Sequence, residues 1–179
     1  TVVCAVWHTA SSDFSSDRRS VFCRGMKPIV ELQRRTTPFP KPQALFVDGH
    51  TLWVSSRTTK HLYALERDSF AVTWETSVPD GMTPWGVTKV ERDLFTVCGT
   101  DASEVDDRVI RRVVPRYGVD PDFRWACPEG MGSHLSHTGA ALVLSQWYPK
   151  KLIFFDAAGV PVRTIDVGHG VVGHCFAQG

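Results

Sequence analysis

The chain has 179 residues, a formal net charge of +1 at pH 7 and five cysteines. This length is enough for one well-buried domain, and the near-neutral charge gives no reason to expect nucleic acid or a membrane surface as a partner. No apolar run approaches the roughly 20 residues that a membrane span needs. The odd number of cysteines and the lack of a CxxC pair argue against a disulfide framework and a zinc site, and they favour a reducing, cytoplasmic location.

Residues 1–25 differ in composition from the rest of the chain. They are rich in Ser, Asp and Arg and show neither strand nor helix periodicity. We expect an irregular or disordered N-terminal segment over 1–25 and a patterned domain over 26–179. Two interpretations of the boundary are open: Met26 is the true start and follows translated upstream sequence, or the first 25 residues are a disordered tail.

The patterned region repeats itself. Similar strand-like runs begin at Leu52, Leu94 and Leu142, and each is preceded ten residues earlier by a similar start at Pro42, Pro84 and Gly132. Repeats of roughly 40–50 residues that each hold several short strands are typical of a β-propeller. A β-sandwich would also contain many short strands, but it does not predict an internal alignment that is nearly free of gaps.

Each repeat reads as four antiparallel strands. The expected strands are 44–47, 51–56, 61–66 and 72–78 in the first unit, 87–90, 93–98, 109–114 and 123–127 in the second, and 135–136, 141–146, 151–156 and 162–167 in the third. Four-stranded antiparallel sheets in series are the blades of a propeller. The sequence therefore predicts an all-β chain: an incomplete β-propeller of about three four-stranded antiparallel blades, with partial strands at both ends.

The partial strands are 29–32 and the start of a fourth unit, because Gly173-His174 aligns with Ser133-His134. Three blades leave unpaired edges, which favour association with another chain. We expect either a fragment of a longer ring or a ring completed by a second copy, and self-association through the blade edges when the chain is alone.

One end of the predicted blades carries the longer and chemically unusual loops. Strand alternation places the loop between the second and third strands at the same end as the connection to the next blade. This end receives 81–85, 99–107, 130–134, 146–148 and 168–174, whereas the opposite end receives short turns. Function concentrates in loops that a rigid scaffold presents, so we expect the binding surface here.

The segments 47–54, 60–65 and 83–87, which read VDGHTLWV, KHLYAL and TPWGV, resemble the repeat of the NHL-type propeller superfamily. This group includes virginiamycin B (streptogramin) lyase and the gluconolactonase and regucalcin lactonases. The resemblance covers roughly 26–179. It implies a ring of six or seven blades with a ligand or divalent cation at the mouth of the central channel. It further implies carboxylate and Asn ligands in a lactonase, or a histidine base near magnesium in a lyase.

His134 and His174 are the first candidate site residues. They occupy equivalent positions at the start of the inner strand, where Ala44 and Gly86 stand in the earlier units. Equivalent positions converge on the channel, so two imidazoles there could bind a metal or accept a proton. The alternative is structural: each ring bonds a neighbouring backbone carbonyl and joins one blade to the next.

The other candidates are Trp85, Gln146, Trp147 and Tyr148. Aromatic side chains in these loops could stack on a ligand, and the counterparts of Trp147 and Tyr148 in the first unit are the polar Arg57 and Thr58. The acidic stretch 101–107 carries oxygen ligands of the kind that calcium prefers, or it is a solvated loop.

Two functions follow as hypotheses. The first is a propeller that binds a small molecule or a peptide on its loop-rich face. The second is a metal-assisted lyase or hydrolase at the channel mouth, with a divalent cation as cofactor and His134 or His174 as the base. The sequence holds no nucleophile elbow, Walker loop or HExxH helix, and its basic pairs are too sparse for nucleic-acid recognition.

Overall fold

The computed structural model describes residues 2–3, 34–102 and 105–176, which fall into two compact units, Thr1–Thr37 and Pro38–Gly179. In the first unit, β1 (Val2–Val3) pairs antiparallel with β2 (Arg34–Arg35). Apart from Val2–Val3, the segment 1–25 lies outside the described residues, as does the strand expected at 29–32. No helix among the described residues is long and apolar enough to cross a membrane.

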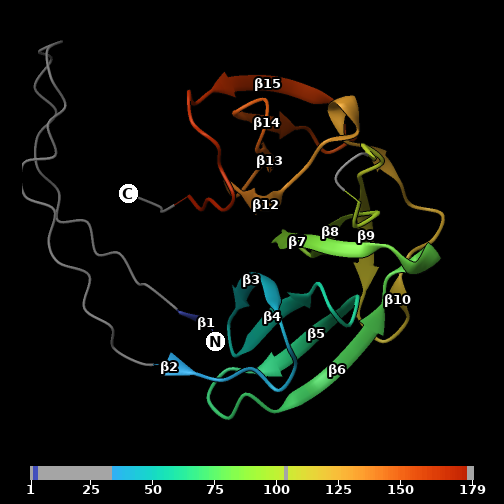
Figure 1. The fold of residues 1–179 in the computed structure, drawn as a ribbon, viewed down its shortest axis with the longest axis vertical. Coiled ribbons are helices and arrows are strands. Elements are labelled where there is room, and N and C mark those ends of the chain that lie inside the picture. Colours follow the sequence, from blue (N-terminus) through green and yellow to red (C-terminus); the bar gives the residue numbers. More distant parts are fainter. Residues whose placement is uncertain (1, 4–33, 103–104, 177–179) are drawn as a thin grey trace, which may run out of the picture. The chain divides into compact units, whose positions relative to one another are not determined.

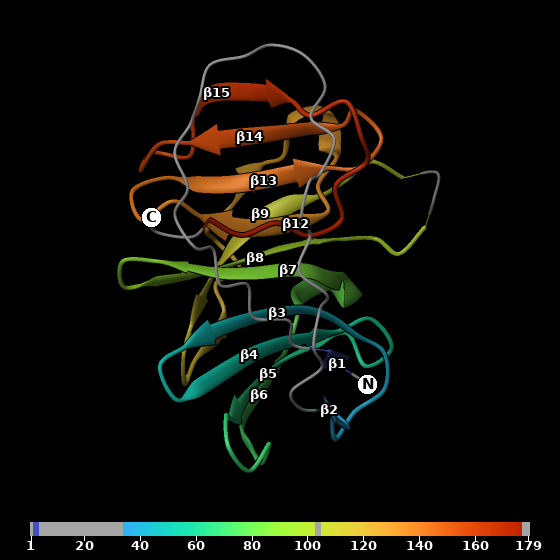
Figure 2. The same ribbon diagram turned by 90° about the vertical axis from the view of Figure 1, so that its left-hand side faces the viewer.

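The second unit contains three antiparallel sheets (Figures 1 and 2). The first is a meander of β3 (Pro42–Asp48), β4 (Thr51–Ser56), β5 (His61–Glu66) and β6 (Val72–Ser77). The third is a meander of β12 (His134–His137), β13 (Leu142–Gln146), β14 (Lys151–Phe155) and β15 (Pro161–Asp166). Both have the strand order expected for propeller blades, and the all-β prediction is confirmed.

The second sheet departs from the prediction at its outer edge. It begins with β7 (Thr83–Val90), β8 (Asp93–Gly99) and β9 (Val109–Val114), but its fourth position is divided between β10 (Gly118–Val119) and β11 (Trp125–Ala126). The single strand expected at 123–127 was therefore wrong. Asp120 lies in the loop between these two strands, where its carboxylate accepts hydrogen bonds from the backbone N–H groups of Asp122 and Phe123 and pairs with Arg112 at 2.7 Å.

Apolar layers fill the spaces between successive sheets. Trp53 and Trp74 meet edge to face with ring centroids 5.7 Å apart in the layer between the first two sheets. Phe95 and Trp125 stack at 5.3 Å in the layer between the second and third. Trp53, Trp74 and Trp125 thus pack between blades.

The first strands of the three sheets follow one another in space (Figures 1 and 2), so β3, β7 and β12 form the inner row of the propeller. At Gly86, β7 lies close against β12. A Cβ added there would lie 2.7 Å from the backbone nitrogen of Leu135 and 3.0 Å from the Cα of His134, both on β12. Glycine at this point lets two inner strands come together without a side chain between them.

Two short 3-10 turns carry the chain from one sheet to the next. Pro79–Gly81 leads into β7, and Pro128–Gly130 leads toward β12. In both, the acidic central residue and the glycine adopt positive φ angles, which are 59° and 66° for Asp80 and Gly81. The turns that precede β7 and β12 therefore share one backbone conformation.

The close approach at Gly86 gives a stability prediction. Gly86→Ala should lower the free energy of unfolding by about 1–3 kcal/mol, because the added methyl group meets backbone atoms that cannot turn aside. Gly173→Ala is the matched control: it has open space around the added atom and should stay within about 0.5 kcal/mol. Urea unfolding followed by tryptophan fluorescence measures both, and equal stabilities would contradict the packing at Gly86.

Candidate functional site

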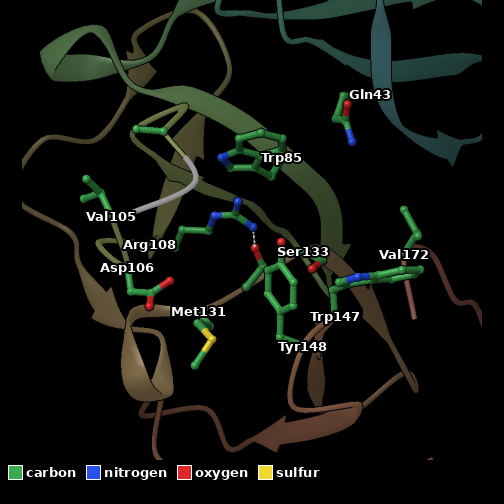
Figure 3. Close-up of a pocket in the computed structure, with 12 residues that line it drawn as sticks. Gln43, Trp85, Val105, Asp106, Arg108, Met131, Ser133, Trp147, Tyr148 and Val172 are labelled. Carbon is green, nitrogen blue, oxygen red and sulfur yellow. Dashed lines mark hydrogen bonds between the residues drawn. The ribbon is translucent and has the colours of Figure 1, made fainter. Parts of the chain in front are cut away.

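A pocket of about 230 Å³ opens among the loops that precede the inner strands (Figure 3). Residues from all three sheets line it, and they include aromatic, apolar and charged side chains: Gln43, Trp85, Ala102, Val105, Asp106, Arg108, Met131, Gly132, Ser133, Trp147, Tyr148 and Val172. Most of these residues come from the loops that strand alternation assigns to one end of the blades. Three sequence candidates, Trp85, Trp147 and Tyr148, are brought together here.

Arg108 and Trp85 form one wall of the pocket. The Arg108 guanidinium lies 4.3 Å from the centroid of the Trp85 ring, and its Nη1 donates a hydrogen bond to the carbonyl oxygen of Gly132, which is the dashed line of Figure 3. Arg57 approaches the same ring at 5.2 Å. Burial lowers the pKa of Arg108, although nearby acidic groups act in the opposite direction. The cation is therefore partly removed from water.

The acidic loop that follows β8 is held by its own carboxylates. Asp101 accepts two hydrogen bonds of 2.7 Å from Arg57, in the bidentate geometry that planar guanidinium favours. Asp107 accepts hydrogen bonds from the backbone N–H and the hydroxyl of Thr100 at 2.9 and 2.6 Å. Asp106 alone of these three lines the pocket, and it is exposed. Among the described residues, no group of three or more His, Cys, Asp or Glu side chains could hold a metal ion.

Trp147 and Tyr148 follow β13 and are unusually exposed for aromatic side chains, at 44% and 78% of their surface. The Trp147 ring is nevertheless supported from one side. A Cβ on Gly170 would lie 2.8 Å from it, so the backbone of the following segment lies directly against the indole. This contact restricts the orientation of the Trp147 ring.

The structure places Gln146 beneath the pocket, outside the residues that line it. Its side chain is buried, and Nε2 donates hydrogen bonds to the carbonyl oxygens of Pro128 at 2.7 Å and Met131 at 3.0 Å. Both acceptors belong to the loop that carries Met131, Gly132 and Ser133 to the pocket. Gln146 therefore supports the loop that lines the pocket and does not itself line it.

His134 and His174 meet edge to face, with ring centroids 5.6 Å apart. Burial lowers the pKa of both, and the neighbouring His134 helps to bring that of His174 to about 4, partly offset by the backbone of Val143. Despite that nearby backbone, neither ring nitrogen of His174 has a hydrogen-bond partner of good geometry within the described part of the chain. Neither histidine is among the residues that line the pocket.

Sequence reasoning missed Arg108 and Gln43. The alignment contains a signal for the first, because Lys60, Arg108 and Lys150 are all basic and all stand directly before the third strand of their blade. Gln43 is equivalent to Trp85 and Ser133, so one lining position recurs in each blade. Comparing equivalent loop positions would have identified both residues.

Solved β-propellers resemble this chain. Virginiamycin B lyase from Staphylococcus aureus matches with a TM-score of 0.52 at 16% identity, over 70% of this chain and 42% of the lyase. Glutaminyl cyclase from Myxococcus xanthus matches with a TM-score of 0.56 at 17% identity, over 73% of this chain and 53% of the cyclase. A structure of streptogramin B lyase gives a TM-score of 0.53 at 15% identity, over 73% of this chain and 42% of that one.

These likenesses establish the fold, a partial β-propeller. The chain spans about half of the length of the solved structures that it matches. No protein-family model matches the sequence, and no curated protein is significantly similar to it. The activities of the lyases and the cyclase are properties of those proteins.

The buried amide of Gln146 gives a second prediction. Gln146→Leu should lower the free energy of unfolding by about 1–3 kcal/mol, because it leaves two loop carbonyls without their donor. Gln43→Leu, at an exposed glutamine of the pocket, is the control and should change stability by less than about 0.5 kcal/mol. Thermal and urea unfolding compare the two variants. Similar losses would show that Nε2 of Gln146 does not hold the loop.

The His174 pKa gives a third prediction. A histidine that titrates at about 4 in the folded state and at 6.5 when unfolded binds fewer protons when folded between these values. Its contribution to stability is therefore complete above pH 6.5 and is lost as the pH falls toward 4, by at most about 1.4 kcal/mol per pH unit. NMR titration of the His174 ring measures the pKa, and His174→Gln should flatten the pH dependence of stability. A ring that titrates near 6.5 would contradict the burial.

Proposed function

We propose that this chain is the part of a β-propeller that binds a small molecule or a peptide in the pocket formed by Trp85, Arg108, Trp147 and Tyr148. The observation that carries the proposal is the exposed aromatic pair Trp147 and Tyr148 beside a concave surface. Large apolar side chains exposed together, rather than singly, mark interaction sites. The first sheet has Arg57 and Thr58 at the equivalent positions. The fold itself therefore does not require aromatic rings there.

The support behind the aromatic residues strengthens the proposal. Gly170 fixes one side of the Trp147 ring, the Gln146 amide holds the loop of Met131, and the Arg57–Asp101 pair holds the acidic loop that contributes Ala102 and Asp106. A site whose walls are already oriented loses less conformational entropy when it binds. These three supports come from different elements and converge on one pocket.

Metal-assisted chemistry at His134 and His174 has less support. Magnesium prefers oxygen ligands, and the pair offers imidazole nitrogens without a third ligand from the described residues. The residues present therefore do not fit that ion. A general base works best when its pKa lies near the operating pH, and a pKa of about 4 makes His174 a weak base at pH 7. We derive no reaction step from this pair.

The test of the proposed function is a ligand screen against the full chain. Aromatic and aliphatic fragments of all charges are added, and binding is followed by NMR chemical shifts and by tryptophan fluorescence. Trp147→Ala and Tyr148→Ala should each weaken the best ligands about 3- to 10-fold, which corresponds to the loss of one ring contact. Tyr117→Ala is the matched control, because Tyr117 is 89% exposed and lies outside the pocket. If no fragment distinguishes the pocket variants from the control, the proposed function is wrong.

A further inference from the structure

The basic residues around the pocket differ in how their charges are used. Arg57 makes a bidentate ion pair with Asp101, and the Lys60 ammonium donates a hydrogen bond of 2.8 Å to the carbonyl oxygen of Gly81. Among the residues that the structure describes, the Arg108 guanidinium donates one hydrogen bond, to the neutral carbonyl of Gly132. Within the described residues, no carboxylate lies within ion-pair distance of Arg108. Its remaining guanidinium N–H donors and its charge are available on the pocket side.

The surroundings of Arg108 increase the gain from an anionic ligand. Its guanidinium lies on the Trp85 ring and is half-buried, so it has lost part of its hydration. Burial acts on its pKa more strongly than the nearby acidic groups do. A charge that has lost water without gaining a counterion is stabilised by a hydrogen-bonded anion more than an exposed arginine would be. Asp106 also lines the pocket, but its carboxylate is exposed, so solvent screens its charge.

The rest of the pocket is suited to a flat apolar group. Trp147 and Tyr148 present exposed rings, and Met131, Val105 and Val172 add apolar surface. Aromatic pairs gain from offset or edge-to-face contacts as well as from burial. Figure 3 shows the rings and the Arg108 side chain arranged around the same space.

We propose that the pocket recognises an aromatic group that carries a carboxylate, with Arg108 binding the carboxylate and Trp147 and Tyr148 contacting the ring. This inference rests on the proposed function and makes it specific in ligand charge. Two sources share the chemistry: a free aromatic acid, and the C-terminal aromatic residue of a peptide. Arginine suits either, because its planar fork matches the two oxygens of a carboxylate.

The experiment compares acids with their neutral amides on the full chain by calorimetry and NMR. Indole-3-propionate and its amide represent the free acid, and N-acetyl-tryptophan and its amide represent the end of a peptide. At least one acid should bind about 10- to 100-fold more tightly than its amide, as expected for a charge-assisted hydrogen bond to Arg108. The pair with the larger ratio identifies the source.

Variants locate the effect at Arg108. Arg108→Gln should remove the preference for the acid and leave binding of the amide nearly unchanged, whereas Arg108→Lys should keep part of it. Arg92→Gln is the matched control, because Arg92 is exposed and lies outside the residues that line the pocket, and it should leave affinity for the acid unchanged. Equal losses of acid binding in Arg92→Gln and Arg108→Gln would overturn the assignment.

The measurements on the unaltered protein keep the inference testable if Arg108 variants fold poorly. Equal affinity for acid and amide would overturn the inference and leave the proposed function standing, because a ligand still binds. No binding by any of the four compounds, together with no binder in the fragment screen, would overturn both. A preference for the acid that persists in Arg108→Gln would also contradict the role of Arg108.

Discussion

Burial of the second sheet on both faces is the constraint on which the rest of this propeller segment depends. Every residue of β8 after Asp93 is buried, because one face packs on the first sheet and the other on the third. At roughly 25 cal/mol per Å² of apolar surface removed from water, such layers are the main favourable term in folding. The same packing brings β7 against β12 at Gly86, and this sets the positions of Trp85 and Ser133 on two sides of the pocket.

The fold could be read from the sequence because blade strands carry a regular pattern. Leu52, Leu94 and Leu142 align in the sequence, and in the structure each occupies the equivalent position on the second strand of its sheet. The fourth strand of the second sheet could not be read, since its interruption depends on where a single carboxylate points. One oxygen of Asp120 accepts the hydrogen bonds of its own loop, and the other accepts a hydrogen bond from Arg112 on β9.

The candidate site was predictable in part. Aromatic residues in loops at one end of the blades, Trp85, Trp147 and Tyr148, are visible as sequence features, and the structure gathers them around one pocket. The sequence did not show which polar residues line the pocket and which support it from behind. Gln146 immediately precedes Trp147 in the sequence. Its amide nevertheless faces the interior, because successive strand residues point to opposite sides. Arg108 looked like one basic residue among 20, and its importance follows from the absence of a described carboxylate partner beside it.

The divided outer edge of the second sheet has a consequence for how the molecule behaves in concentrated solution. A long, continuous edge strand is a template for cross-β stacking, in which strands from many copies pair side by side. The gap between β10 and β11 leaves two ladders of two residues each, and the Asp120 loop fills the space between them with a charged pair. At the outer edge of the third sheet, Pro161, Arg163 and Asp166 along β15 act as gatekeepers of the same kind. The interrupted edge therefore offers a further strand only two short ladders with which to pair.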